Sequence, residues 1–181
     1  MMAKPAKKSD HRIKKQLILV MFGLMILAAT FGCGNPAIDL TDYGTETITL
    51  IGLDDDIDAD EDKIQRITLT ISELQSMDCV TVKTNSTSDK IGNVKATGPL
   101  LETVTNVYGE TLSNFSKLII TATDGYEIVL NQPFISENKL ILAFGIDGQP
   151  LGEDEAPLRL IVPESDSAYW IRMIESIEFI R

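Results

Sequence analysis

His11 is the only histidine among the 181 residues, and it lies in the lysine-rich start of the chain. The residues that follow it therefore cannot form a Ser-His-Asp or Cys-His constellation, a histidine metal site or a histidine general base. Gly92 and Gly98 lack the spacing of a phosphate-binding loop, and no Lys-Ser or Lys-Thr pair follows them. These patterns disfavour hydrolases and nucleotide-dependent enzymes. A glycosidase-type carboxylate pair stays open, because spacing alone does not mark a raised pKa.

The first cysteine, Cys33, follows a segment typical of export signals. Thr30-Phe31-Gly32-Cys33 resembles a bacterial lipobox, and it ends an apolar run from Leu17 to Phe31. This run is shorter than the roughly 20 residues of a spanning helix. We predict a lipoprotein signal peptide at residues 1–32, a lipid on Cys33, a tether at 33–44, and a domain at 45–181 on the extracytoplasmic face of a bacterial membrane. Ordinary secretion with cleavage near Ala29 is the alternative.

The second cysteine, Cys79, is predicted to be a buried structural thiol, not a nucleophile or ligand. If Cys33 carries a lipid, no disulfide is available to the domain.

The chain is strongly acidic. Its net charge is −11, and six of its 16 basic residues but only one of its 27 acidic residues lie in the predicted signal peptide. The rest of the chain therefore carries ten basic and 26 acidic residues, a net charge of −16. A charge of this size repels nucleic acid and anionic lipid surfaces, so we expect neither as a nonspecific partner.

Seven of the acidic residues lie between Asp54 and Asp62. The run raises the hypothesis of a calcium-responsive surface protein, but it lacks the glycine and glutamate that an EF-hand loop needs at its sixth and twelfth positions. A solvated acidic loop is the favoured interpretation.

One segment opposes the general acidity. Between Val80 and Gly98, three lysines (Lys83, Lys90 and Lys95) stand against Asp89 alone, among Thr, Ser and Asn side chains. Such a patch could hold a small anion. The alternative, which we favour, is that the lysines solvate an edge strand and deter its pairing with other strands.

Short alternating runs predict an α+β fold, because they are not separated by regular crossover helices. Asp124-Gly125 and Asp147-Gly148 predict turns between strands. The predicted strands are 45–53, 67–71, 80–84, 91–96, 118–123, 126–130, 140–146 and 158–162. Helices are predicted from Ser72 to near Met77, from Pro99 to Gly109, and over Trp170 to Ile177, followed by a last short strand at Phe179 and Ile180.

Several motifs in fixed order resemble the oxidoreductase molybdopterin-binding domain, the sulfite-oxidase-like family. The motifs are Ile71-Ser-Glu-Leu, Val80-Thr-Val, Lys95-Ala-Thr-Gly-Pro-Leu-Leu, Thr123-Asp-Gly-Tyr, Leu142-Ala-Phe, Asp147-Gly-Gln-Pro-Leu, Ala156-Pro-Leu-Arg-Leu-Ile-Val-Pro, and Trp170 with Ile177-Glu. The resemblance covers residues 68–180 and implies a mixed, curved, partly barrel-like sheet with two or three short helices.

The resemblance also implies where a cofactor would lie. Enzymes of this family hold molybdenum through a cysteine in the loop after the strand that matches Val80 to Thr84, and they grip the pterin phosphate with His, Arg and Lys. Here that loop contains no cysteine. We predict a candidate cofactor or ligand site without metal ligands or catalytic residues, made of Lys83, Thr84, Asn85, Ser86, Thr87 and Arg159.

We therefore expect a lipid-anchored, non-catalytic binding or interaction module with no bound cofactor, whose partner is a small anion or an envelope protein. The first alternative is a molybdopterin-dependent oxidoreductase in which Cys79 supplies the thiolate and Lys83, Lys90 or Arg159 holds the phosphate. The second is the calcium-responsive protein.

Overall fold

The computed structural model describes residues 38–53, 65–88 and 92–181. The predicted signal peptide, Cys33, the acidic run and Lys90 lie outside the described residues. Among the described residues, no helix has the length and apolarity needed to cross a membrane.

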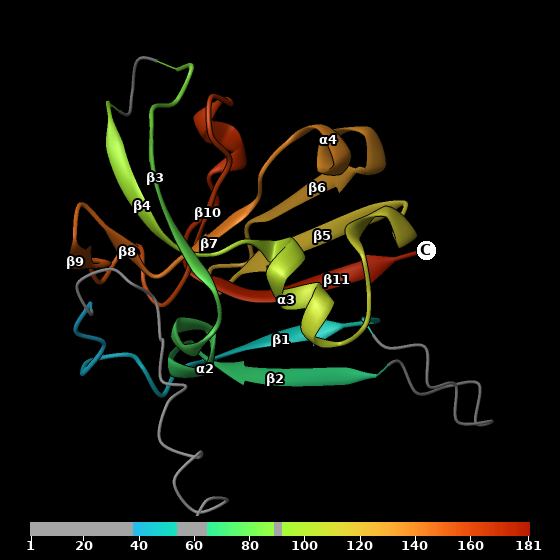
Figure 1. The fold of residues 1–181 in the computed structure, drawn as a ribbon, viewed down its shortest axis with the longest axis horizontal. Coiled ribbons are helices and arrows are strands. Elements are labelled where there is room, and N and C mark those ends of the chain that lie inside the picture. Colours follow the sequence, from blue (N-terminus) through green and yellow to red (C-terminus); the bar gives the residue numbers. More distant parts are fainter. Residues whose placement is uncertain (1–37, 54–64, 89–91) are drawn as a thin grey trace, which may run out of the picture. The chain divides into compact units, whose positions relative to one another are not determined.

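A five-stranded sheet, in the order β2-β1-β11-β5-β6, carries much of the core (Figure 1). Its strands are β1 (Thr47–Ile51), β2 (Arg66–Thr70), β5 (Lys117–Ala122), β6 (Glu127–Asn131) and β11 (Ile174–Ile180). β1 and β11 pair in parallel, and the other neighbours are antiparallel. Asp124-Gly125 forms the turn between β5 and β6, as predicted, and Gly125 has a positive φ of 81°.

Two smaller sheets complete the described strands. One has the order β3-β4-β8-β9, and the other pairs β7 with β10. Their strands are β3 (Cys79–Thr84), β4 (Val94–Pro99), β7 (Ile141–Ala143), β8 (Gly145–Ile146), β9 (Gln149–Pro150) and β10 (Arg159–Ile161). β3 and β4 form a long arm (Figure 1), and β3 is an edge strand. Asp147-Gly148 turns β8 into β9 and not into the strand predicted at 158–162, whereas β7 pairs with β10. The single strand predicted at 140–146 is divided into β7 and β8.

Three short α-helices connect these strands within the described residues: α2 (Ile71–Ser76), α3 (Leu101–Val107) and α4 (Gln132–Glu137). Two 3-10 turns, η1 (Leu112–Asn114) and η2 (Ser167–Tyr169), accompany them. Thr70 and Glu73 form a capping box that starts α2. The predicted α+β class with few helices is confirmed, although the sheets are separate and do not close into a barrel.

Along the strands of the five-stranded sheet, side chains that face the core alternate with side chains that face outward. The side chains of Ile48, Leu50, Leu118, Ile120 and Ile177 have no exposed surface. Burying a side chain of this size contributes about 1.5–3 kcal/mol. β7 and β10 are almost entirely buried, so these two strands contribute chiefly to the core.

Residues 38–44 fall within the predicted tether, but they pack on the domain. Ile38, Leu40 and Tyr43 are buried. The Tyr43 hydroxyl donates to the carbonyl of Phe144 at 2.6 Å and accepts from the amide of Leu151 at 2.8 Å. Residues 38–44, which the sequence analysis assigned to the tether, are therefore packed against the domain.

One predicted helix is absent from the structure, and the predicted start of another is wrong. The segment from Trp170 to Ile177 is not a helix: η2 precedes it and β11 occupies its second half. Gly98 and Pro99 end strand β4 instead of starting α3, which begins at Leu101. Val107, the last residue of α3, is 61% exposed, because the buried side of the helix consists of Leu101, Val104 and Thr105.

Candidate functional site

The loop that follows β3 is the first part of the predicted site. Thr84, the last residue of the strand, is 4% exposed, and Ser86 is 5% exposed, while Asn85 and Thr87 point to solvent. The Ser86 hydroxyl accepts from the Ser88 amide at 3.1 Å and shares a hydrogen bond with the Ser88 hydroxyl at 2.9 Å. The loop is thus held in shape by its own neutral side chains.

A second segment, from Glu164 to Ser167, closes over this loop. The Thr87 amide donates to the Ser165 carbonyl at 2.9 Å, and the Ser86 hydroxyl donates to the same oxygen at 3.3 Å. The Ser88 and Ser167 hydroxyls lie 2.6 Å apart. We call Ser86, Ser88, Ser165 and Ser167 the serine cluster.

Two further bonds fix the position of the cluster. The Glu164 amide donates to the hydroxyl of Thr84 at 3.2 Å, which explains why this threonine tolerates burial at the end of β3. On the other side, the Trp170 indole donates to the Val162 carbonyl at 2.8 Å and to the Ser165 hydroxyl at 3.2 Å. The loop and the segment after β10 therefore act as one hydrogen-bonded unit.

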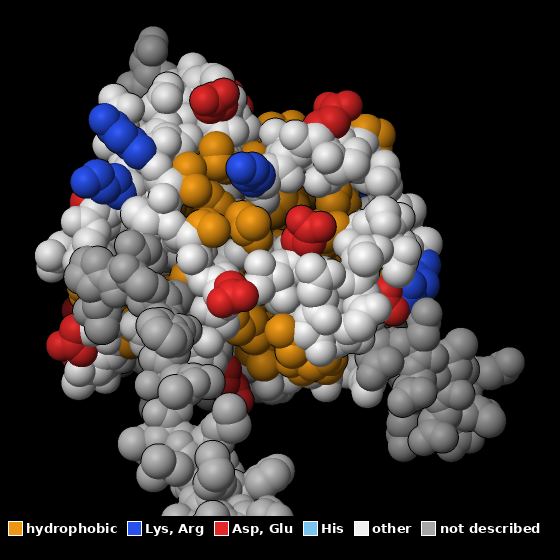
Figure 2. Space-filling view, in the orientation of Figure 1, with side chains coloured by type: hydrophobic (Ala, Val, Ile, Leu, Met, Phe, Trp, Pro, Cys, Tyr) orange, Lys and Arg blue, Asp and Glu red, His pale blue; other side chains and the backbone are white. Residues whose placement is uncertain are grey.

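The structure separates Lys83 from this unit. Because successive side chains of a strand point to opposite faces, Lys83 lies on the other face of β3 from Thr84. Lys83 instead stands directly opposite Lys95 in the β3–β4 ladder, and both side chains are exposed. Figure 2 shows two basic side chains together on this arm. Two of the three lysines of the predicted patch, Lys83 and Lys95, therefore lie opposite each other, whereas Lys90 lies outside the described residues.

Arg159, the last predicted site residue, lies on β10. It is connected to the loop only through Trp170, whose indole bonds to the serine cluster. Its guanidinium forms an ion pair with Glu155 and lies over the Trp170 ring, 5.8 Å from the centroid. The side chain is 12% exposed, and Nε is buried without a hydrogen-bond partner among the described residues. Burial lowers the pKa of Arg159; the Glu155 carboxylate opposes this shift and Arg172 adds to it.

Cys79 lies far from the loop. It is the first residue of β3 and Asn85 follows the last, so about 20 Å separates them at ~3.3 Å per residue. Its sulfur lies 3.3 Å from the Met77 carbonyl oxygen and 3.7 Å from those of Leu74 and Gln75, near the end of α2. Cys79 is only partly buried, not buried as predicted. Carbonyl oxygens would repel a thiolate, so this environment still suits a structural thiol.

The sequence prediction missed Ser165 and Ser167, which supply half of the serine cluster. Their only signal is the run Ser165-Asp166-Ser167, in which the Asp166 carboxylate accepts from the Ala168 amide and starts η2. Such a run is typical of any turn, and its contact with a loop 79 residues earlier cannot be seen in it. The prediction also missed α4, although Pro133 marks its first turn.

The topology and the motif strands define the class: an α+β domain with the framework of a molybdopterin-binding oxidoreductase. Residues 55–181 match the family described as the oxidoreductase molybdopterin binding domain. The chain therefore belongs to that family, as its motifs predicted.

Among solved structures, the chain is similar to the sulfane dehydrogenase SoxCD from Paracoccus pantotrophus, with a TM-score of 0.59 and 16% sequence identity. The match covers 81% of this chain but only 40% of that one, so the chain spans less than half the length of this relative. At this identity the likeness shows the fold alone. No curated protein matches the chain.

The family's name implies a molybdopterin cofactor, and the donor atoms around the loop test whether one fits. The loop offers hydroxyl and amide groups where the family resemblance places a ligating cysteine. These hydroxyls are already bonded to one another and to the segment 164–167. Among the described residues, no group of three or more His, Cys, Asp or Glu side chains could hold a metal ion. The loop therefore lacks the cysteine through which the family resemblance places molybdenum, and its hydroxyls already have partners within the protein.

Proposed function

We propose that this chain is a lipid-anchored, extracytoplasmic, non-catalytic binding module built on the molybdopterin-binding fold. The observation that carries the proposal is the serine cluster, which occupies the place where the family resemblance puts the ligating cysteine. A fold can keep its framework after the groups that perform chemistry are replaced, because function resides in a small number of side chains. The module's partner is a small anion or a protein of the cell envelope.

Metal analysis tests the non-catalytic part of the proposal. The full chain, produced in a bacterial host that makes the molybdenum cofactor, should contain far less than one molybdenum per chain. A cysteine-ligated family enzyme produced in the same host controls for cofactor supply. Stoichiometric molybdenum that is lost in Cys79→Ser would overturn the proposal in favour of an oxidoreductase with an atypical ligand.

Support for the anchor comes from the lipobox-like run that ends at Cys33. Cells fed a labelled fatty acid should incorporate it into the wild-type chain and not into Cys33→Ser. A Cys79→Ser variant is the matched control, since it removes the other cysteine. Equal labelling of wild type and Cys33→Ser would contradict the lipid anchor.

The Lys83 and Lys95 pair supports the small anion as partner. Like charges placed directly opposite each other in a ladder cost stability, and a bound anion would remove that cost. Sulfate should raise the melting temperature of the wild type more than that of Lys95→Gln. Lys139→Gln, which removes an exposed lysine elsewhere, should behave as the wild type. An equal response in the wild type and both variants would contradict an anion site on the arm.

A further inference from the structure

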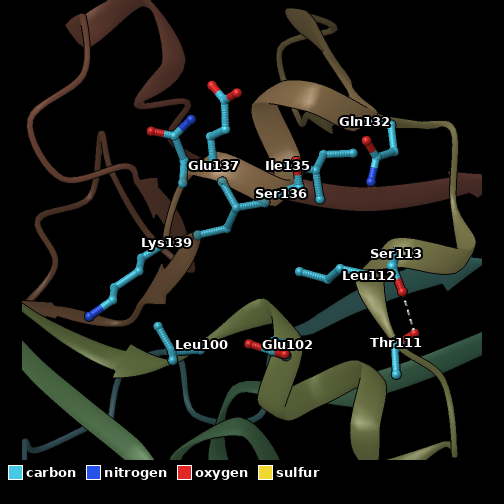
Figure 3. A pocket seen from close by; sticks show the side chains of 12 residues that line it. Leu100, Glu102, Thr111, Leu112, Ser113, Gln132, Ile135, Ser136, Glu137 and Lys139 are labelled. Carbon is cyan, nitrogen blue, oxygen red and sulfur yellow. Dashed lines mark hydrogen bonds between the residues drawn. The ribbon is translucent and has the colours of Figure 1, made fainter.

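A cavity of about 460 Å³ lies between the start of α3, η1 and α4 (Figure 3). Leu100, Leu112, Ile135 and Leu140 give it apolar walls, and Glu102 and Gln132 add polar groups. We call this space the α3–α4 cavity. Its volume falls within the range of small-molecule sites in proteins, about 300–1,000 Å³.

The walls of the cavity are fixed by the backbone. The backbone amide of Leu101, the first residue of α3, donates to the Leu140 carbonyl at 2.8 Å. The backbone amide of Gln132, the first residue of α4, donates to the Ser116 carbonyl at 2.8 Å. Ile135 and Leu140 are 3% and 2% exposed. The cavity is therefore preformed, because backbone hydrogen bonds and buried side chains fix its walls.

Several polar groups at the rim already have partners. The hydroxyls of Thr111 and Ser113 bond to each other at 2.9 Å, and the side-chain amide of Asn138 donates to the Phe134 carbonyl at 2.8 Å. Among the described residues, the Glu102 carboxylate makes no hydrogen bond or ion pair. This carboxylate is thus available to a ligand.

The charged side chains are also oriented unequally. In Figure 3 the Glu102 carboxylate lies at the side of the cavity opposite Ile135, whereas the Glu137 carboxylate and the Lys139 ammonium extend away from it. Figure 2 shows apolar side chains gathered over this part of the surface, with acidic and basic groups at its margin. Glu102 is exposed and lines the cavity, so the site offers a solvent-accessible negative charge beside its apolar walls.

We propose that the α3–α4 cavity binds a small organic cation that combines an apolar body with an ammonium or guanidinium group. The apolar body fills the space between Leu100, Leu112 and Ile135, and the cationic group pairs with Glu102. The net charge of −11 attracts cations and repels anions of the same shape. The size and concavity of the site favour a free small molecule over a protein surface.

This inference goes beyond the proposed function and does not depend on it. None of the serine-cluster residues, Lys83 or Arg159 lines the cavity. Metal analysis and fatty-acid labelling test the proposed function and do not test ligand binding at the cavity, so either proposal can fail without the other.

The test is a titration of the isotope-labelled full chain, followed by amide chemical shifts, with three probes that share one apolar body. These are 2-phenylethylammonium, 2-phenylethanol and 3-phenylpropionate, which carry a positive charge, no charge and a negative charge. The amine should give saturable shifts at Leu112, Gln132 and Ile135. We expect it to bind about three- to fivefold more tightly than the alcohol, the size typical of an exposed ion pair, and the carboxylate should bind most weakly.

Three variants locate the effect. Glu102→Gln should reduce the amine's affinity to that of the alcohol, and Leu112→Gln should weaken both probes. Glu127→Gln, an exposed glutamate on β6, should leave the ranking unchanged. Absence of saturable shifts at the cavity, equal affinity for all three probes, or an unchanged ranking in Glu102→Gln would each overturn the proposal.

Discussion

The hydroxyl groups of Ser88 and Ser167 lie 2.6 Å apart, although 79 positions separate the two residues in the chain. The bond joins the loop after edge strand β3 to the segment that leads into Trp170. Loops at the end of an edge strand are commonly mobile, because few ladder bonds hold them. Here a set of neutral side-chain hydrogen bonds constrains the loop.

The serine cluster should therefore be measurable as stability. Ser86→Ala removes the buried hydroxyl that serves the Ser88 amide, the Ser88 hydroxyl and the Ser165 carbonyl. We expect the free energy of unfolding to fall by about 1–2 kcal/mol, because buried polar groups lose partners. Urea unfolding measures this change. Ser113→Ala, which removes an exposed hydroxyl bonded only to Thr111, should cost under about 0.5 kcal/mol, and equal effects would contradict a special role for the cluster.

Arg159 and Glu155 should be energetically coupled. The pair is largely shielded, with side chains 12% and 30% exposed, and the guanidinium also lies over Trp170. In a double-mutant cycle with Arg159→Met and Glu155→Gln, we expect a coupling of about 1 kcal/mol, read from urea unfolding. Glu153→Gln, an exposed neighbour of Glu155, should be additive with Arg159→Met. A coupling near zero for Glu155 would mean that the stacking on Trp170, not the ion pair, holds Arg159.

The sequence predicts the strands of this fold better than its ends. Alternating runs located β1, β2, β3, β5 and β6 correctly, because each of these strands has one buried face. The helix predicted over the C-terminal segment from Trp170 to Ile177 is wrong for a specific reason. β11 has an irregularity in its register with β5 between Ile174 and Ser176, so Ile174 and Ile177 both face the core although they are three residues apart. A bulge of this kind produces helical spacing within a strand.

The candidate site was predicted in part. The loop from Thr84 to Thr87 could be located because it follows a clear strand and contains only polar residues. Its closure by Ser165 and Ser167 could not, since that contact depends on how β10 and the following segment pack against β3. Alternation within the strand also separates Lys83 from Thr84, which the prediction placed in one site.

Tyr43 should make stability depend on alkaline pH. Burial raises the pKa of its hydroxyl above the ordinary value of 10.0; Asp42 and Glu46 add to this shift, and the bond from the Leu151 amide opposes it. Because the folded pKa is the higher one, the contribution of the neutral hydroxyl is fully present below about pH 10 and is lost as pH rises through the folded value.

Tyr43→Phe separates this contribution from the titration of other groups. The substitution leaves the Leu151 amide and the Phe144 carbonyl without their buried partner, so we expect a loss of about 1–3 kcal/mol at neutral pH. The difference between wild type and variant should shrink above pH 10. Tyr126→Phe, at a tyrosine that is 53% exposed, is the control and should change little at any pH. A constant difference from pH 7 to 11 would contradict the assignment.

Gly98 should be the least replaceable glycine among those described. A β-carbon there would lie 1.9 Å from the carbonyl oxygen of Leu142 and 2.9 Å from the α-carbon of Ala143, both of which are backbone atoms of β7. Backbone atoms cannot move aside as a flexible side chain can, so β4 and β7 would have to separate. We expect Gly98→Ala to lower the free energy of unfolding by about 3 kcal/mol or more. Gly92→Ala is the matched control, because a β-carbon at Gly92 meets no atom within 4 Å and should change stability by under about 1 kcal/mol. Thermal unfolding of the two variants decides the matter: if Gly98→Ala melts with the wild type, β4 and β7 do not pack as closely as described, and the strand that ends in Gly98-Pro99 must end elsewhere.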